Sequence, residues 1–441
     1  MRIHLTLLLA LAGAGHAADF ALRADGTILK DGQPFFPFGF YTSFEGLTEA
    51  QGHAALDAIA AGGFNLVQMV NNAIRDNPPN YPMWALLDRA HELGLWTILS
   101  STSNNITTGT QVAYREKPAI MAWEINDDAD DGRWTLAEAQ ARADVIKATD
   151  PTRLTFISLT GWSQARRDAA TEWSAIGELV GPQIYPIGAR NNAGIDPAQA
   201  LAEAYRRNVL YVDAAAASGH AVITTMQTFN WGSPSPAPRY PTAVESRNMT
   251  YGALAAGAKG LIGYTFLGLE SQAELWSELQ RQADEVALLA PVLLDGERSR
   301  LATGNADLAA TTWRSGSDVT VAVLNLSGGA AQAVALAMPA GAHGLQALFA
   351  DRPSGLSLSD GQLTGTIEPM AVHVYRLSTS AVTPPAGGGS GGGFGSPVGG
   401  GAGAGGGSGS RRCGMGEGLA LVVLLGAGLA WCPARRSGSH R

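Results

Sequence analysis

Eight apolar runs of strand length alternate along the chain with stretches of helix length. This alternation is typical of α/β folds, in which each strand is followed by a helix that packs against a parallel sheet. The candidate strands are 35–41, 64–70, 95–101, 119–128, 154–159, 179–187, 221–229 and 260–266. Eight such units predict a (β/α)8 TIM barrel. An open doubly wound sheet is the alternative, but no Gly-x-Gly-x-x-Gly turn follows the first strand to support it.

The pattern changes after Pro291. Strand-length runs at 309–314, 319–326, 331–337 and 371–377 are separated by Gly, Ser and Asp turns, with no helical stretch between them. We therefore expect two folded domains, a barrel over residues 18–291 and a small antiparallel β-sandwich over 292–379 that packs on the barrel.

Residues 1–17 are predicted to be a signal peptide that directs export. Arg2 precedes an apolar run, and the small residues Gly15 and Ala17 frame a cleavage position before Ala18. The alternative is that this segment forms an N-terminal strand of the fold.

The 55 glycines are unevenly distributed, and about fifteen of them fall within Ala386–Ser410 near the other end of the chain, so residues 380–412 are predicted to be a Gly-rich linker. Residues 413–441 then combine Cys413-Gly, a short apolar run and an Arg cluster, which predicts a membrane segment with a cytoplasmic C-terminus. This arrangement resembles the GlyGly, MYXO and JDVT C-terminal sorting tails of bacterial exported proteins. The resemblance implies a sorting protease as a partner and leaves open whether the tail anchors the protein or is removed.

Charge and residue usage exclude several functions. The net charge is −8, and arginines concentrate in the tail, so the folded body is acidic and a poor candidate for binding nucleic acid. Both cysteines, Cys413 and Cys432, belong to the tail. The eight histidines are scattered without metal-ligand spacing, and no P-loop or Gly-x-Ser-x-Gly motif occurs in the body. We expect no metal and no cofactor.

The fourth candidate strand carries the main catalytic signal. By the alternation of a strand, Ala122, Glu124, Asn126 and Asp128 are predicted to face the barrel interior, whereas Met121 faces the helices. Two carboxylates close together in an enclosed site push one pKa upward, as a general acid requires. The alternative is a solvated acidic turn that caps the next helix, made of Asp127, Asp128, Asp130 and Asp131.

Five segments match a known group in order and spacing. They are Asp31–Tyr41, Trp123–Asp128, Tyr185–Ile187, Arg239–Glu245 and Ala256–Gly260. Together they resemble clan A glycoside hydrolases, and especially the β-galactosidase-like barrels that carry a C-terminal β-domain, over roughly residues 25–377.

In that clan the fourth strand ends in Asn-Glu or Asp-Glu-Pro, and the Glu is the acid/base. Alignment on Trp123 places Asp127 at the first of these positions and Asp128 at the second. The resemblance implies that Asp128 is the general acid. We expect Asp127 to tune it, and the strand alternation adds Glu124 as a second carboxylate deeper inside the barrel. Asp is one methylene shorter than the Glu of the clan.

The nucleophile of the clan is a Glu at the end of the seventh strand, where this chain has Gln227. Gln cannot form the glycosyl ester of a retaining mechanism. Glu270 is the first candidate for the missing carboxylate, with Glu245 and Glu45 as others, and inverting chemistry would use one of them to activate water. Each can instead be an ordinary surface or helix-cap carboxylate.

Aromatic and amide side chains near strand ends suggest sugar binding, because sugar rings stack on aromatic rings and amides bond their hydroxyls. Core packing is the alternative for each aromatic residue. The predicted substrate-binding residues are Tyr41, Asn71, Asn126, Trp162, Tyr185, Gln227, Trp231 and Tyr264.

These observations favour an exported glycoside hydrolase-like protein that acts on a β-linked oligo- or polysaccharide. A catalytically inactive carbohydrate-binding surface protein is the second hypothesis, because Gln227 occupies the position of the nucleophile. A barrel that serves only as a scaffold is the third.

Overall fold

The computed structural model describes residues 18–70, 82–100, 108–188, 197–232, 238–352 and 355–379. The predicted signal peptide, Gly-rich linker and sorting tail lie outside these residues. Within these ranges, no helix is both long and apolar enough to cross a membrane.

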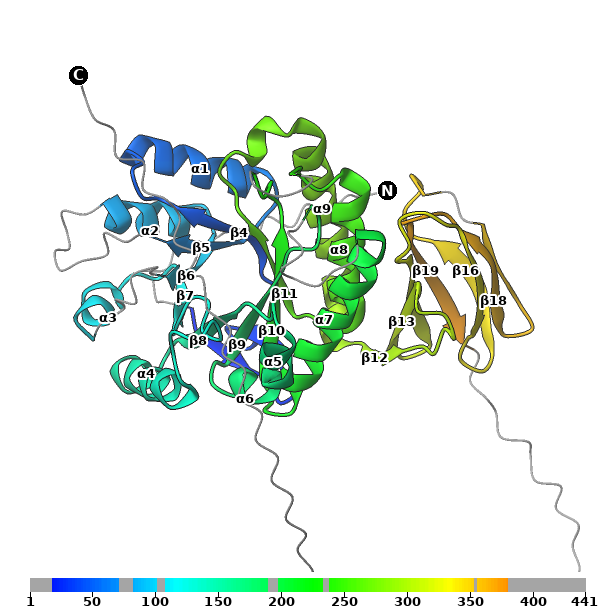
Figure 1. Cartoon of the computed structure of the whole chain (residues 1–441), viewed down its shortest axis with the longest axis horizontal. Coiled ribbons are helices and arrows are strands. Elements are labelled where there is room, and N and C mark those ends of the chain that lie inside the picture. Colours follow the sequence, from blue (N-terminus) through cyan, green and yellow to red (C-terminus); the bar gives the residue numbers. More distant parts are fainter. Residues whose placement is uncertain are drawn as a thin grey trace, which may run out of the picture. The chain divides into compact units, whose positions relative to one another are not determined.

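Eight parallel strands close into a barrel, and each pairs with the next one along the chain (Figure 1). They are β4 (Phe38–Ser43), β5 (Leu66–Val70), β6 (Trp96–Ser100), β7 (Ile120–Glu124), β8 (Leu154–Leu159), β9 (Leu179–Ile184), β10 (Ala221–Gln227) and β11 (Gly260–Tyr264). All eight predicted strands are present, so the TIM barrel is confirmed.

Helices surround the barrel, and three of them begin with a reciprocal capping box, at Thr48, Thr135 and Thr242. The helices are α1 (Glu49–Ala61), α2 (Pro82–Glu92), α3 (Thr108–Tyr114), α4 (Leu136–Thr149), α5 (Gln164–Asp168), α6 (Ala170–Ser174), α7 (Ala200–Ala216), α8 (Ala243–Ala256) and α9 (Ala273–Asp295), with short 3-10 turns η2 (Pro197–Gln199) and η3 (Leu269–Ser271). Helix α9 passes through Pro291 and ends four residues beyond the expected domain boundary.

A short N-terminal sheet precedes the barrel. Its strands are β1 (Phe20–Leu22), β2 (Ile28–Lys30) and β3 (Gln33–Pro34). Phe20 and Ile28 belong to the same buried cluster as the interior side chains Leu66, Leu154 and Ala221, which lie at the start of their strands. This sheet therefore covers the N-terminal end of the barrel and leaves the opposite end for a site.

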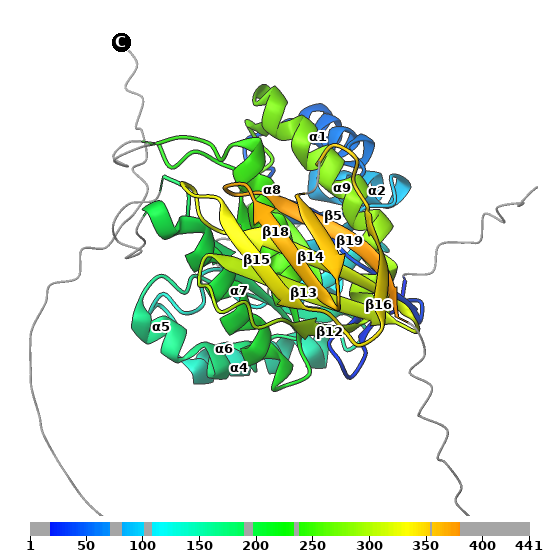
Figure 2. The same ribbon diagram turned by 90° about the vertical axis from the view of Figure 1, so that its right-hand side faces the viewer.

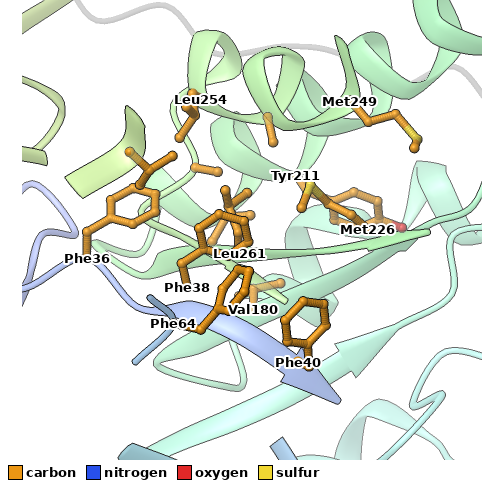
Figure 3. Packing of buried hydrophobic residues seen from close by; sticks show 14 of the residues in the cluster. Phe36, Phe38, Phe40, Phe64, Val180, Tyr211, Met226, Met249, Leu254 and Leu261 are labelled. Carbon is orange, nitrogen blue, oxygen red and sulfur yellow. The ribbon is translucent and has the colours of Figure 1, made fainter. Parts of the chain in front are cut away.

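The largest buried cluster fills the layer between the strands and the helices. Figure 3 shows Phe38, Phe40 and Phe64 within it, and the Phe64 ring lies edge-on to Phe40 at 4.7 Å and to Phe38 at 5.1 Å. Edge-to-face packing of this kind suits aromatic rings in a dense core.

The C-terminal sandwich has two antiparallel sheets, which Figure 2 shows face-on. One contains β12 (Glu297–Arg300), β13 (Leu308–Ser315), β14 (Asp318–Asn325), β19 (Val372–Thr379) and β16 (Ala342–Ala347), and the other contains β15 (Gln332–Ala337), β18 (Gln362–Ile367) and β17 (Leu356–Ser359). Their facing side chains form a separate buried cluster.

The sandwich is joined to the barrel through α8. Asn248 Nδ2 donates to the carbonyl oxygens of Asn325 (2.8 Å) and Met370 (3.0 Å), and Thr311 Oγ1 donates to that of Ala255 (2.9 Å). The predicted packing of the β-domain on the barrel is therefore present.

One strand departs from strict alternation. Thr97 and Ile98 of β6 pair with Ile120 and Ala122 of β7, so Met121 is an extra residue in the ladder. Met121 consequently joins the interior cluster, and the prediction that it faces the helices is wrong. The expected parity resumes at Ala122, also in that cluster.

Candidate active site at the open end of the barrel

Polar side chains replace apolar ones where the barrel strands end. Gln68 of β5 donates from Nε2 to Ser100 Oγ of β6 (3.2 Å) and to Glu124 Oε1 of β7 (3.1 Å). Glu124 is only 3% exposed, and burial followed by repulsion from Asp127 holds its pKa well above the usual range. Burial therefore favours the protonated form of Glu124, which is enclosed at the end of β7 before the other two carboxyls.

Asp127 is the carboxyl best suited to deliver a proton near neutrality. Burial raises the pKa of Asp127 to about 7, with repulsion from Asp128 as the second cause, while a hydrogen bond to Ser158 and the charge of Arg133 oppose the rise. A carboxyl that keeps its proton up to about pH 7 can act as a general acid.

Asp128 lies beside it in a more polar setting. Its backbone has φ of 51°, a left-handed conformation that Asp tolerates at turns, so strand β7 and its alternation stop before this residue. Asp128 Oδ1 accepts from Gln183 Nε2 (2.6 Å), and Arg133 Nη2 lies 3.6 Å from Oδ2. Burial raises the pKa of Asp128, but Gln183 and Arg133 both favour its ionised form.

The acidic segment after β7 is not a solvated helix cap. Thr135, not an aspartate, caps α4. Asp130 is 6% exposed and accepts three hydrogen bonds from Thr160 and Gly161, whereas Asp131 pairs with Arg133 Nε at 2.5 Å. Asp130 and Asp131 thus have their own partners within the protein. Asp127 and Asp128 remain as a pair of neighbouring carboxyls that repel each other when both are ionised.

Two predicted substrate-binding amides are enclosed. The Asn126 amide nitrogen donates to the Ile125 carbonyl oxygen (3.2 Å), and its oxygen accepts from the Trp134 indole (3.3 Å). Asn126 is 2% exposed. Asn126 is therefore buried, and its position does not support the prediction that it contacts a sugar.

Gln227 is 0% exposed and makes three backbone hydrogen bonds. Its Oε1 accepts from Ile187 N (2.8 Å), and its Nε2 donates to the carbonyl oxygens of Ile187 (2.8 Å) and Phe229 (3.1 Å). Gln227 therefore holds the segment after β9 in place and does not face the open end, contrary to its prediction as a substrate ligand.

Five predicted aromatic residues form a continuous row with Phe229 across the open end. Ring centroids are separated by 4.5 Å (Tyr41–Tyr264), 5.5 Å (Tyr264–Tyr185), 5.2 Å (Tyr185–Phe229), 5.0 Å (Phe229–Trp231) and 6.5 Å (Trp231–Trp162). The structure thus brings Tyr41, Tyr185, Tyr264, Trp231 and Trp162 together.

The tyrosines of this row stay neutral. Burial holds the pKa of Tyr41 and Tyr185 well above the usual range and raises that of Tyr264 to about 12, and Asp127 and Asp128 raise all three further. Their hydroxyls are donors rather than nucleophiles. In the described part of the chain, the buried Tyr185 hydroxyl and Trp231 indole N–H have no hydrogen-bond partner.

The other candidate carboxylates lie elsewhere. Glu270 is exposed in η3, and Glu45 is exposed after β4. Glu245 pairs with both Arg239 guanidinium nitrogens at 2.6 Å and caps α8. Glu245 is thus a structural carboxylate. Asn71 lies outside the described residues.

A cavity of about 310 Å³ at the opposite end of the barrel has a structural explanation. Of its charged lining, Arg298 Nη1 donates to the Ala256 carbonyl oxygen at the end of α8 (2.7 Å), and Lys259 Nζ lies 3.5 Å from the Leu293 carbonyl oxygen in the last turn of α9. Both cations offset helix C-termini. Across the described ranges, no group of three His, Cys, Asp or Glu side chains is arranged to hold a metal ion.

Sequence reasoning missed the neutral partners of the carboxyls. Gln68 lies in the middle of β5, whereas Ser100 and Ser158 lie at or next to the ends of β6 and β8; the alternation of these strands could have indicated that all three face inward.

The sequence matches no protein-family model and no curated protein. Solved structures are similar in fold. A glycoside hydrolase matches with a TM-score of 0.59 at 15% identity, over 82% of this chain and 97% of that one. A family 5 glycoside hydrolase from Bacteroides vulgatus matches with 0.57 at 16% identity, over 82% and 94%. A family 27 β-L-arabinopyranosidase from Geobacillus stearothermophilus matches with 0.53 at 13% identity, over 78% and 97%. The chain therefore has the TIM-barrel and β-domain fold found in these glycoside hydrolases.

Proposed function

We propose that this protein hydrolyses glycosidic bonds of a β-linked oligo- or polysaccharide at the open end of the barrel. The observation that carries the proposal is the adjacent pair Asp127 and Asp128, of which one keeps its proton to about pH 7 and the other is held by Gln183 and Arg133. The aromatic row beside the pair offers faces on which sugar rings stack.

We assign the two roles in the reverse of the order that the family resemblance implies, and the electrostatics of the pair support this assignment. Asp127 donates a proton to the departing glycosidic oxygen, because its protonated form is the stable one at neutral pH. Asp128 accepts a proton from the attacking water, because Gln183 and Arg133 favour its carboxylate. Water attack without a glycosyl ester inverts the anomeric centre, and the enclosed amide of Gln227 is consistent with a reaction that uses no carboxylate on β10.

The test is hydrolysis of cello-, manno-, xylo- and galacto-oligosaccharides by the mature protein, followed by chromatography and by NMR of the first-formed anomer. Wild type should release sugars with inverted configuration. Binding without turnover would favour the carbohydrate-binding alternative, and a retained anomer would exclude the assigned roles.

We further propose that the protein is exported and carries a removable or anchoring tail, on the sequence of residues 1–17 and 413–441. The intact mass of the protein purified from the cell envelope should correspond to a chain that has lost residues 1–17. A chain that still begins at Met1 would contradict export by this signal.

A further inference from the structure

Trp162 is a large side chain that the fold keeps half open at the rim of the site. It follows β8, is 36% exposed, and meets Trp231 at 6.5 Å between ring centroids with an interplanar angle of 65°. Two indoles at this angle make a corner that ends the aromatic row on the side away from Tyr41.

The backbone next to Trp162 is held by a single buried carboxylate. Asp130 Oδ1 accepts from Thr160 N (2.7 Å) and Thr160 Oγ1 (2.8 Å), and Oδ2 accepts from Gly161 N (2.9 Å). Bonds of this kind to a charged acceptor are stronger than neutral ones.

Two arginines of α5 complete the support. Arg166 donates to Thr160 Oγ1 (2.7 Å) and to the Asp131 carbonyl oxygen (2.8 Å), and Arg167 donates to the Gly161 carbonyl oxygen (3.1 Å). Gly161 has φ of 56°, and a Cβ there would lie 2.2 Å from the Tyr211 hydroxyl oxygen. These contacts restrain the backbone from which the Trp162 side chain extends.

The alternative explanation is that Asp130 has a purely structural role and only links the segment after β7 to the segment after β8. This explanation accounts for the hydrogen bonds of Asp130 but not for the exposure of Trp162 beside them. A large aromatic side chain is more stable when buried, so its exposure on a well-held segment calls for another reason. A stacking subsite requires rigid support of an exposed indole. Trp162 has this support and contacts a second indole, Trp231, which is linked through ring contacts to Tyr185 and Tyr264 near the carboxyl pair.

We propose that Asp130 is a positioning residue for Trp162, and that Trp162 and Trp231 form a subsite for a sugar residue beyond those at Asp127 and Asp128. The inference rests on the proposed carbohydrate substrate. It predicts that the protein prefers oligosaccharides long enough to span from the carboxyl pair to the indole corner.

The experiment compares disaccharides with pentasaccharides of the cello, manno and xylo series. The variants are Asp130→Asn, which cannot accept from both backbone N–H groups, and Trp162→Ala; Asp168→Asn on the exposed part of α5 is the matched control. Asp130→Asn and Trp162→Ala should each raise KM for the pentasaccharide about three- to tenfold, with kcat unchanged. The disaccharide KM and the control should not change.

A merely structural role would lower kcat on both lengths or leave KM unaltered, and either result overturns the inference. The double variant should lose no more than Trp162→Ala alone, because Asp130 acts through Trp162; additive losses would contradict that. Tryptophan emission should shift on adding pentasaccharide to wild type and should shift less for Asp130→Asn.

Calorimetry separates this inference from the hydrolase proposal. Pentasaccharide binding that Asp130→Asn weakens, in a protein without turnover, would support the subsite and reject hydrolysis. Hydrolysis that is indifferent to both variants would reject the subsite alone, and absence of any binding would reject both.

Discussion

Gln227→Glu tests whether the seventh-strand amide is a structural residue or a lost nucleophile. In wild type, Nε2 donates to the Ile187 and Phe229 carbonyl oxygens at 2.8 and 3.1 Å in a site that is 0% exposed. A carboxylate oxygen there would face two acceptors, so the new Glu must keep its proton and can still satisfy only one of them. One buried carbonyl left unpaired costs about 1–3 kcal/mol.

The cost also depends on pH in a defined direction. Burial and the two carbonyls raise the folded-state pKa of the introduced acid, while the unfolded chain ionises near about pH 4.3. Stability relative to wild type should therefore be highest below that pH and fall by up to about 1.4 kcal/mol per pH unit above it, until the folded-state pKa is reached.

Urea unfolding at pH 5 and pH 8 measures this difference. Gln227→Met is the matched control, because it removes the hydrogen bonds without adding an acid and should lose stability equally at both pH values. Equal stability of Gln227→Glu at pH 5 and 8, or a gain in glycoside hydrolysis, would refute the reasoning and show that position 227 reaches the site.

Three further outcomes follow from particular contacts. Asp127→Asn should gain up to about 4 kcal/mol relative to wild type at pH 8 and nothing at pH 3. Because the pKa of Asp127 is raised to about 7, the folded protein keeps this proton while the unfolded chain ionises from about pH 4, so wild type loses stability between about pH 4 and about pH 7; denaturation at pH 3 and pH 8 checks this. Arg352→Met should cost about 3–5 kcal/mol by leaving the buried Glu285 without its ion-pair partner, and adding Glu285→Gln should restore part of the loss in the same assay. Gly161→Ala should lower stability by about 2 kcal/mol or more, and Tyr211→Phe in the same chain should relieve only the clash, leaving the backbone strain of about 1 kcal/mol visible in Tm.

The barrel was predictable because each strand pairs with its neighbours in sequence. Apolar runs such as 154–159 and 179–187 match β8 and β9 to within three residues. The helices were expected because stretches of helix length alternate with these strands, whereas their capping boxes at Thr48, Thr135 and Thr242 were not predicted.

The elements that sequence reasoning missed carry weak local signals. β16 and β17 are edge strands of the sandwich with several exposed residues, so they lack an apolar run. The N-terminal sheet around Phe20 and Ile28 has strands of two or three residues, shorter than any periodicity can show. Tertiary packing decides such elements.

The site was only partly predictable. Asp127 and Asp128 were predicted because they are carboxylates at the end of the fourth candidate strand. The residues of the aromatic row other than Phe229 were predicted because they lie near strand ends. Which aspartate keeps its proton depends on Ser158 of β8, Gln183 of β9 and Arg133 in the segment after β7, and only the folded barrel brings the two strands beside the pair. The Met121 bulge and the inward burial of Gln227 likewise arise from contacts between strands.

The central claim is that Asp127 supplies the proton in glycoside hydrolysis, and the pH dependence of kcat/KM on an oligosaccharide, for wild type and Asp127→Asn, tests it most directly. Wild-type kcat/KM should fall as the pH rises through about 7, where Asp127 loses its proton. Asp127→Asn should lose about 100-fold or more and show no such fall. An Asp127→Asn variant that retains wild-type hydrolysis, or the same alkaline fall in both proteins, would contradict the account.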